Sequence, residues 1–340
     1  MNKLLGLILI FFTFLLPASG QLKSLAATAT TSTTIKFEGY SNFSLPSFCD
    51  DKGRSYVKLL QPGMGMDGPV FRISNKGTVE AEFDITGTLG NTFAVRPNGG
   101  IAAAHLDGKT KVIDNFGPDG QREVEIRLEQ PPIPFFPMQI AIFPSGGILL
   151  SGAQYRASDQ ASAAVYDPNG HLMKVVALEG DANSGHTIPI GNKKSSPAPL
   201  ADPSSISRSV AITGDDGNVY LMSATSPPTV YAISQAGEVL LKITVQGPAG
   251  AAGPDFGIRV IKNRLVVEFY RECSGSQEGS CQGTVFSILN ASTGERLANY
   301  ALGEPASRVL ACYAPDPDRF FMFQDAPNGT AIEIVESVPK

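Results

Sequence analysis

The chain is short of the residues that many functional sites need. It has no tryptophan and three histidines, His105, His171 and His186, no two of which share the spacing of a zinc site. It also lacks any run of lysine or arginine, and its formal net charge is −5. We therefore predict no zinc site, no nucleic-acid partner and no binding to anionic membranes.

Long hydrophobic runs are also missing, except at the start of the chain. Lys3 precedes an apolar stretch over residues 4–16, which is too short to span a membrane. A small-residue cleavage site follows and ends at Gly20. These features predict a signal peptide over residues 1–20, a secreted or periplasmic mature protein and no membrane span.

Sequences typical of tight turns are abundant. The chain has 35 glycines and 25 prolines, and only 17% of its residues are charged, which favours short strands joined by turns. One turn pattern returns six times at a period of roughly 45 residues, at residues 50–53, 97–100, 144–147, 214–217, 262–263 and 316–318. A second turn follows five of these copies, at residues 74–77, 117–120, 167–170, 234–237 and 290–294.

The turns divide the chain into six units, each with room for four short strands. In the second unit the expected strands cover residues 91–95, 101–105, 110–116 and 122–129, and the last one alternates polar and apolar residues. Such alternation is typical of a half-exposed outermost strand. The pattern predicts an all-β fold, a six-bladed β-propeller.

The sixth unit predicts how the ring closes. It has only three expected strands, over residues 308–313, 319–324 and 330–336. Residues 33–37 form the one strand-like segment outside the units, so we expect them to complete the last blade as its outer strand and to remove a free sheet edge. The mature chain would then consist of a flexible N-terminus over residues 21–32 and a single β-propeller domain over residues 33–340.

Two stretches carry a resemblance to known proteins, Val-Arg-Pro-Asn-Gly-Gly-Ile at residues 95–101 and Ala-Ile-Thr-Gly-Asp-Asp-Gly-Asn-Val-Tyr at residues 211–220. With these turns the chain resembles NHL-type and related six-bladed propeller repeat proteins over nearly its whole mature length. The resemblance implies an architecture and no particular activity. WD40 repeats are disfavoured because the chain has no tryptophan, and kelch repeats because the Gly-Gly pairs lack a later aromatic pair.

The two faces of such a propeller differ in their loops. The recurring turns join first to second and third to fourth strands and define the tight-turn face. The opposite, long-loop face carries the longer segments, at residues 61–68, 130–137, 152–160, 179–207, 247–256 and 271–283. Loops on a rigid scaffold commonly bind ligands, so we predict recognition on the long-loop face. The alternative is that these loops lengthened because length there is harmless.

Four cysteines in an exported protein predict two disulfides. Cys273 and Cys281 flank a Gly/Ser-rich loop between two strands, which favours a local bridge. By elimination Cys49 pairs with Cys312, since both precede the first turn of their units, in blades 1 and 6. That bridge would lock the ring. Two free thiols are the alternative, if neighbouring inner strands lie too far apart.

Arginines gather at one end of the expected inner strands. Arg208, Arg259 and Arg308 stand at or near the start of the innermost strands of blades 4, 5 and 6, at the long-loop mouth of the channel. Three guanidinium groups there would bind an anionic ligand, such as a carboxylate, a phosphate or an acidic glycan. The alternative is that each arginine pairs with a neighbouring carboxylate or a loop carbonyl.

Aromatic and basic residues also occur together in the long loops. Tyr155, Arg156, Phe256, Tyr270 and Arg271 lie in or beside them. Exposed aromatic side chains next to arginine are typical of recognition hot spots. We therefore include these five residues in the predicted ligand-binding set.

Several six-bladed families that the chain resembles are metal-dependent lactonases or lyases. The resemblance would imply a ring of Glu, Asn and Asp at the inner mouth, because hard cations need converging oxygens. The corresponding positions, residues 47, 91–92, 138–139, 208–209, 257–259 and 307–308, hold no acidic residue. Asp50, Asp51, Asp215 and Asp216 lie on the tight-turn face, where they are expected to shape turns. We predict no metal, no cofactor and no catalytic residue.

The sequence thus favours an exported, non-enzymatic and monomeric propeller that binds a protein or glycan partner through its long-loop face. The arginines at the channel mouth would contribute if the ligand is anionic. Two alternatives stay open. One is a secreted or periplasmic lactonase-like hydrolase or lyase, which the missing acidic ring disfavours. The other is a structural scaffold without a small-molecule site.

Overall fold

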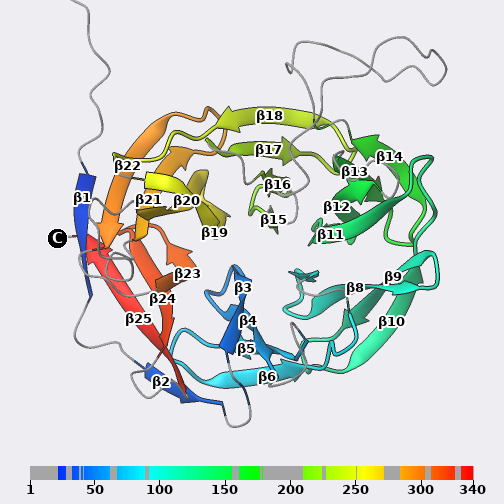
Figure 1. Ribbon diagram of the computed structural model, residues 1–340, viewed down its shortest axis with the longest axis horizontal. Coiled ribbons are helices and arrows are strands. Elements are labelled where there is room, and N and C mark those ends of the chain that lie inside the picture. The colour runs from blue at the N-terminus through cyan, green and yellow to red at the C-terminus, as the bar shows by residue number, and fades with distance from the viewer. Residues whose placement is uncertain are drawn as a thin grey trace, which may run out of the picture.

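A computed structural model gives the structure of most of the chain. It describes residues 22–27, 33–37, 40, 42–61, 67–88, 92–154, 161–176, 178, 210–223, 227–249, 251–271, 284–302, 308–325 and 331–339. Within these ranges the chain forms 25 β-strands and no helix. The strands build six antiparallel blades around a central axis, which confirms the predicted six-bladed β-propeller (Figure 1).

The first four blades share one order, in which each strand pairs with the next and the chain runs from the axis to the rim. Blade 1 contains β3 (Asn42–Cys49), β4 (Ser55–Leu60), β5 (Val70–Ile73) and β6 (Val79–Phe83). Blade 2 contains β7 (Phe93–Val95), β8 (Ile101–Asp107), β9 (Thr110–Phe116) and β10 (Arg122–Arg127). Blade 3 contains β11 (Phe135–Ile142), β12 (Ile148–Gln154), β13 (Ala161–Tyr166) and β14 (Leu172–Val176). Blade 4 contains β15 (Val210–Thr213), β16 (Val219–Met222), β17 (Thr229–Ile233) and β18 (Val239–Thr244).

The last two blades include strands from both ends of the chain. Blade 5 contains β19 (Ala251–Ile261), β20 (Arg264–Arg271), β21 (Thr284–Asn290) and β22 (Arg296–Leu302). Blade 6 contains β23 (Arg308–Ala314), β24 (Arg319–Asp325), β25 (Ala331–Pro339) and, as its outer strand, β2 (Thr33–Lys36). β2 runs antiparallel to β25 and pairs Thr33 with Ile334. The predicted closing strand is therefore confirmed.

A second N-terminal strand joins blades 5 and 6 at the rim. β1 (Leu22–Ala27) runs parallel to β22 and antiparallel to the end of β25, so the two blades form one nine-stranded sheet. Residues 21–32 were predicted to be flexible, and the part in β1 is a strand instead. The outer edges of β22 and β25 present backbone groups that need partners, and β1 supplies them. Figure 1 shows β1 beside the C-terminus.

The core lies between neighbouring blades. Between blades 2 and 3, for example, Ala104 and Ile113 belong to one buried cluster with Ile140 and Leu150. Between blades 6 and 1, Phe323 is buried in a cluster with Val57. Each sheet thus buries apolar side chains on both of its sides, as in other radial arrays of sheets.

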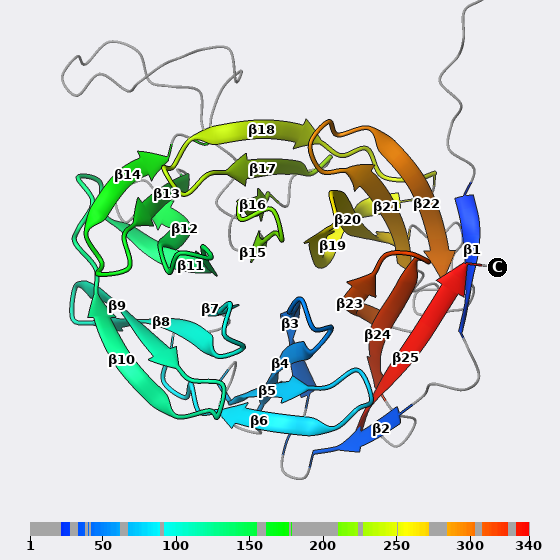
Figure 2. The same cartoon turned by 180° about the vertical axis from the view of Figure 1, so that it is seen from behind.

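Tight turns gather at the C-terminal ends of the innermost strands, on the tight-turn face. The turn of blade 2 shows why the pattern requires glycine. Gly99 has a φ of 85°, and a Cβ there would lie 2.3 Å from Nη2 of Arg54. The position therefore combines a left-handed backbone with a close contact from blade 1. Figure 2 shows the ring from the opposite side to Figure 1, with the six innermost strands around the axis.

Candidate functional site

The innermost strands surround a central channel, and polar side chains on them bond to the backbone of the next blade. Ser47 Oγ on blade 1 donates to the carbonyl of Leu310 on blade 6 at 2.8 Å. Thr213 Oγ1 on blade 4 donates to the carbonyl of Ile142 on blade 3 at 2.7 Å. Such bonds supply a donor to inner-strand carbonyls that have no hydrogen-bond donor within their own sheet.

Arg259 makes the most extensive of these contacts. It lies on β19 with 6% of its surface exposed. Its Nη2 donates to the carbonyls of Ser47, Leu310 and Ala311 at 3.0, 2.8 and 2.7 Å. Its Nη1 donates to the carbonyl of Ile258 at 2.6 Å. One guanidinium group therefore connects the innermost strands of blades 5, 6 and 1.

The strands that supply these carbonyls are irregular beside Arg259. The register of β23 shifts between Leu310 and Cys312, and that of β3 shifts between Ser44 and Phe48. A β-bulge turns backbone groups out of the ladder of its own sheet. Here the freed carbonyls face the guanidinium group.

Burial also affects the pKa of this arginine. Loss of solvent lowers the pKa of Arg259 to about 10, and the negative charge of Glu268 opposes that change. Glu268 is fully buried on β20, and its carboxylate accepts the backbone N–H of Leu310 at 3.3 Å. Gly257 leaves room for it, because a Cβ there would lie 1.9 Å from Oε2 of Glu268. Arg259 remains a cation at neutral pH, and its donors face backbone carbonyls, which is the alternative to ligand binding set out above.

The predicted bridge between the first and last blades is confirmed. Cys49 on β3 and Cys312 on β23 form a disulfide with 5.3 Å between their Cα atoms. We name the contacts made by this disulfide, by Ser47 with Leu310 and by Arg259 the closure seam. Cys273 and Cys281 lie outside the described residues, and their pairing stays a prediction.

The structure describes the backbone of four of the other predicted ligand-binding residues. Tyr270, near the end of β20, has 51% of its surface exposed. Arg308 begins β23, opposite Gln324. The backbones of Phe256 and Arg271 belong to β19 and β20. Arg208, Tyr155 and Arg156 lie outside the described residues, so the convergence of the three arginines and the whole predicted set stay a prediction.

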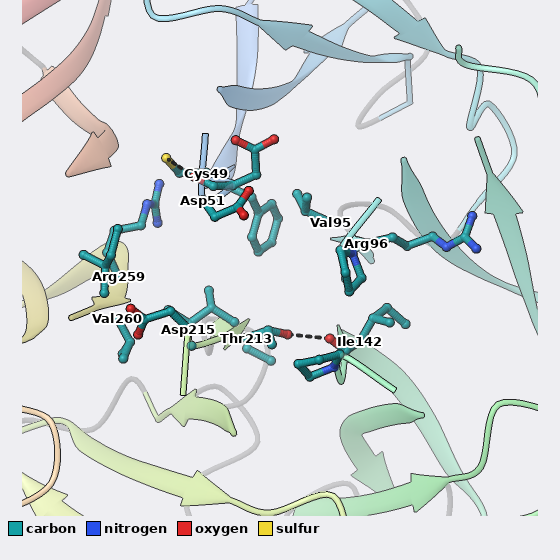
Figure 3. Close-up of a pocket in the computed structure, with 18 of the residues that line it drawn as sticks. Cys49, Asp51, Val95, Arg96, Ile142, Thr213, Asp215, Arg259 and Val260 are labelled. Carbon is teal, nitrogen blue, oxygen red and sulfur yellow. Dashed lines mark hydrogen bonds between the residues drawn. The ribbon is translucent and has the colours of Figure 1, made fainter. Parts of the chain in front are cut away.

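A cavity of about 220 Å³ lies at the other end of the channel, in the tight-turn face (Figure 3). We call it the central cavity. Inner-strand ends from all six blades line it, and its apolar wall includes Phe48, Val95, Ile142, Ile212 and Val260. The sequence does not predict the central cavity, because the width of the cavity depends on how far the six strand ends lie from the axis.

Two carboxylates stand at the edge of the central cavity. Asp51 and Asp215 line it and are exposed. Asp215 also accepts the backbone N–H of Lys262 at 2.6 Å, across the junction with blade 5. Arg96 lines the same space, but its guanidinium group points away from it and donates to Glu123 at 2.7 Å (Figure 3).

Other aspartates of the tight-turn face hold turns and tyrosines. Asp50 accepts the backbone N–H of Arg54 at 2.9 Å and the hydroxyl of Tyr56 at 3.0 Å. Asp216 accepts the hydroxyl of Tyr220 at 2.8 Å. Burial and then the nearby carboxylate raise the pKa of both tyrosines. These contacts agree with the turn-shaping role expected for the aspartates.

Over the ranges that the structure describes, no three His, Cys, Asp or Glu side chains form a group that could hold a metal ion. Those same ranges contain no helix with the length and hydropathy to cross a membrane.

Comparison with known proteins shows the fold and no more. No protein-family model and no curated protein sequence matches the chain. Among solved structures, a gluconolactonase from Xanthomonas campestris is similar with a TM-score of 0.51 and 12% identity, over 94% of this chain and 96% of that one. A protein of unknown function from Dyadobacter fermentans is similar with a TM-score of 0.52 and 10% identity, over 93% of this chain and 99% of that one. At such identities the likeness supports the propeller architecture alone.

Proposed function

We propose that this chain is an exported binding module that recognises a protein or glycan partner through its long-loop face and catalyses no reaction. One observation carries the proposal. Four polar side chains on or beside the innermost strands join blades to one another. Besides Ser47, Thr213 and Arg259, Thr92 Oγ1 donates to the carbonyl of Met138 at 3.2 Å. A general acid or base needs a group that can reach a substrate proton, and these groups face backbone carbonyls instead.

One observation favours the hydrolase hypothesis, the structural similarity to a gluconolactonase. A metal-dependent site of that kind would need converging oxygen ligands at the inner mouth. At the corresponding positions, Ser47 and Thr92 donate to neighbouring carbonyls, and Arg259, which lies toward the tight-turn end of β19, does the same. Because these side chains bond to neighbouring backbone, they do not present the converging oxygens that a hard cation needs, which supports the binding module over the hydrolase.

Tyr270 is the described residue that best fits a recognition role on the long-loop face. Its ring is half exposed, and a Cβ at Gly253 would lie 2.7 Å from its hydroxyl oxygen. The ring therefore lies close against the backbone of the adjacent strand. A tyrosine held in this way presents contact area at a low cost in side-chain entropy. Arg271 follows it in the sequence and would supply charge.

Two assays on the mature protein, residues 21–340, test the proposal. The first measures hydrolysis of δ-gluconolactone and related lactones with calcium and with a chelator, and we expect no turnover above the uncatalysed rate in either. Metal-dependent turnover would overturn the proposal.

The second assay screens immobilised glycans and the exported proteins of the source organism for binding. The affinity for each partner found is then measured again with variants. Tyr270→Ala should weaken a specific interaction by about tenfold, the effect of a moderate hot spot. Leu240→Ala, which removes an exposed side chain from the rim strand β18, serves as the matched control and should leave affinity unchanged. Equal affinity in both variants would point to the scaffold alternative.

A further inference from the structure

We propose that the central cavity binds a small organic cation, an ammonium group that carries an apolar substituent. This site lies on the tight-turn face, opposite the long-loop face, and nothing in the proposed function requires it. The two proposals can therefore fail separately. The inference rests on the wall of the central cavity, on the direction of the charged groups around it and on the rigidity of the strand ends.

The wall of the central cavity favours an apolar group. Phe48, Ile142 and Ile212 line it, and each is more than nine-tenths buried in the fold. Its volume of about 220 Å³ exceeds the roughly 150 Å³ of an apolar protein cavity that accommodates benzene. A phenyl ring or a branched alkyl group would therefore fit, whereas a folded partner would not enter.

The edge of the central cavity favours a positive charge. Asp51 and Asp215 project from blades 1 and 4 and are exposed beside the apolar wall. One oxygen of Asp215 accepts the backbone N–H of Lys262, which holds that carboxylate in place. A recess with low-dielectric walls and charge of one sign concentrates the field and attracts ions of opposite sign. An ammonium group at the edge, with its substituent inside, would satisfy both features.

The remaining charged side chains that line the central cavity form ion pairs or hydrogen bonds with other protein groups. Asp50 lies 2.6 Å from Nη2 of Arg54, and its charge is thus offset within its own turn.

The two arginines that line the central cavity also bond to other protein groups. Arg96 donates to Glu123, and Arg259 donates to carbonyls of the closure seam while the buried carboxylate of Glu268 opposes its charge. Figure 3 shows the guanidinium group of Arg96 directed away from the central cavity and that of Arg259 directed toward Cys49. The exposed charge at the edge is therefore negative, so an anion would be disfavoured there.

The central cavity is also formed before any ligand arrives. The disulfide between Cys49 and Cys312 fixes one side, and the hydrogen bond from Thr213 to Ile142 fixes the other (Figure 3). A site whose walls are already ordered loses little conformational entropy on binding.

Titration calorimetry or chemical-shift titration with phenethylamine at low ionic strength tests the proposal. We expect saturable binding at one site and at least fivefold weaker binding of 2-phenylethanol, which has the same ring and no charge. Phenylacetate should not bind, and added salt should lower the affinity for phenethylamine. Two further probes, the tripeptide Phe-Gly-Gly and its N-acetylated form, distinguish a free amine from the N-terminus of a peptide.

Three variants locate the site. Asp51→Asn should lower the affinity for phenethylamine by up to about fivefold, the effect of one exposed ion pair. Val95→Phe should abolish binding by filling the central cavity. Asp119→Asn removes the same charge from an exposed turn outside the lining and should bind as the unchanged protein does. Thermal unfolding verifies that each variant is folded. The proposal is overturned if Asp51→Asn and Val95→Phe bind normally, or if the alcohol or the acid binds as tightly as the amine.

Discussion

The junction between blades 6 and 1 and the junction between blades 3 and 4 are built differently. Blades 3 and 4 pack through a buried apolar cluster, and Thr213 adds one hydrogen bond between their inner strands. Blades 6 and 1 also pack through an apolar cluster, but the closure seam adds a disulfide and the guanidinium group of Arg259.

Chain connectivity explains this difference. Blade 4 follows blade 3 in the sequence, whereas the cysteines that join blades 6 and 1 are 263 residues apart. Bringing such distant segments together carries the largest loss of chain entropy, so cross-links contribute most there. On the rim, β1 and β2 reinforce the same region by pairing with β25.

The largest effect should come from removing the covalent part of the closure seam. Cys49→Ser combined with Cys312→Ser should lower the free energy of unfolding by about 3 to 5 kcal/mol, because the bridge closes a very long loop of the unfolded chain. Guanidinium denaturation under oxidising conditions measures it, with Cys273 and Cys281 unchanged in both proteins. A loss below about 1 kcal/mol would show that the disulfide is dispensable.

Removing the guanidinium group comes next. Arg259→Met should cost about 2 to 4 kcal/mol, because it removes the guanidinium donors from the buried carbonyls of Ser47 and Ala311 and leaves the Leu310 carbonyl with the Ser47 hydroxyl alone. Arg259→Lys should recover only part of this loss, since one ammonium group cannot reach all three carbonyls. Chemical denaturation checks both variants, and full stability of Arg259→Met would refute the joining role assigned to the residue.

Alkaline pH should weaken the junction between blades 5 and 6. Tyr300 and Tyr313 both donate to Asp318, and burial with this carboxylate raises the pKa of each hydroxyl. The folded state then holds protons that the unfolded state releases above about pH 10, so stability is complete below that pH and falls as pH rises.

The variant Tyr300→Phe with Tyr313→Phe tests this explanation. It should be less stable at pH 7 by about 1.5 to 3 kcal/mol, because it loses hydrogen bonds to a charged group. Above pH 10 its stability should fall less steeply than that of the unchanged protein. Urea denaturation across a pH series would reveal this, and identical slopes would contradict the assignment.

The smallest effect should appear at the ordinary junction. Thr213→Val removes the hydrogen bond to Ile142 and keeps the shape of the side chain, so it should cost about 1 kcal/mol. The same denaturation series provides the measurement. A cost as large as that of Arg259→Met would erase the distinction between the two junctions.

Much of this fold could be predicted from local sequence. Turns such as residues 97–100 give the blade count, because a tight turn depends on a few neighbouring residues. The incomplete sixth unit predicted that β2 closes the ring, and the matching positions of Cys49 and Cys312 predicted their bond.

The remaining features depend on distant parts of the chain. β1 forms because β22 and β25 bring two edges together, and nothing within residues 22–27 encodes those partners. The sequence predicted that Arg259 lies at the channel. Its hydrogen-bond partners depend on bulges in β3 and β23, which local sequence patterns do not show. The central cavity likewise depends on the spacing of six strand ends.

Amide hydrogen exchange of the Cys49→Ser and Cys312→Ser double variant tests the closure most directly, because it reports local opening strand by strand. If the closure seam holds the two ends of the ring together, exchange should accelerate in β3 and β23 and stay unchanged in β11 and β15. Equal acceleration in all four strands, or none in β3 and β23, would contradict it.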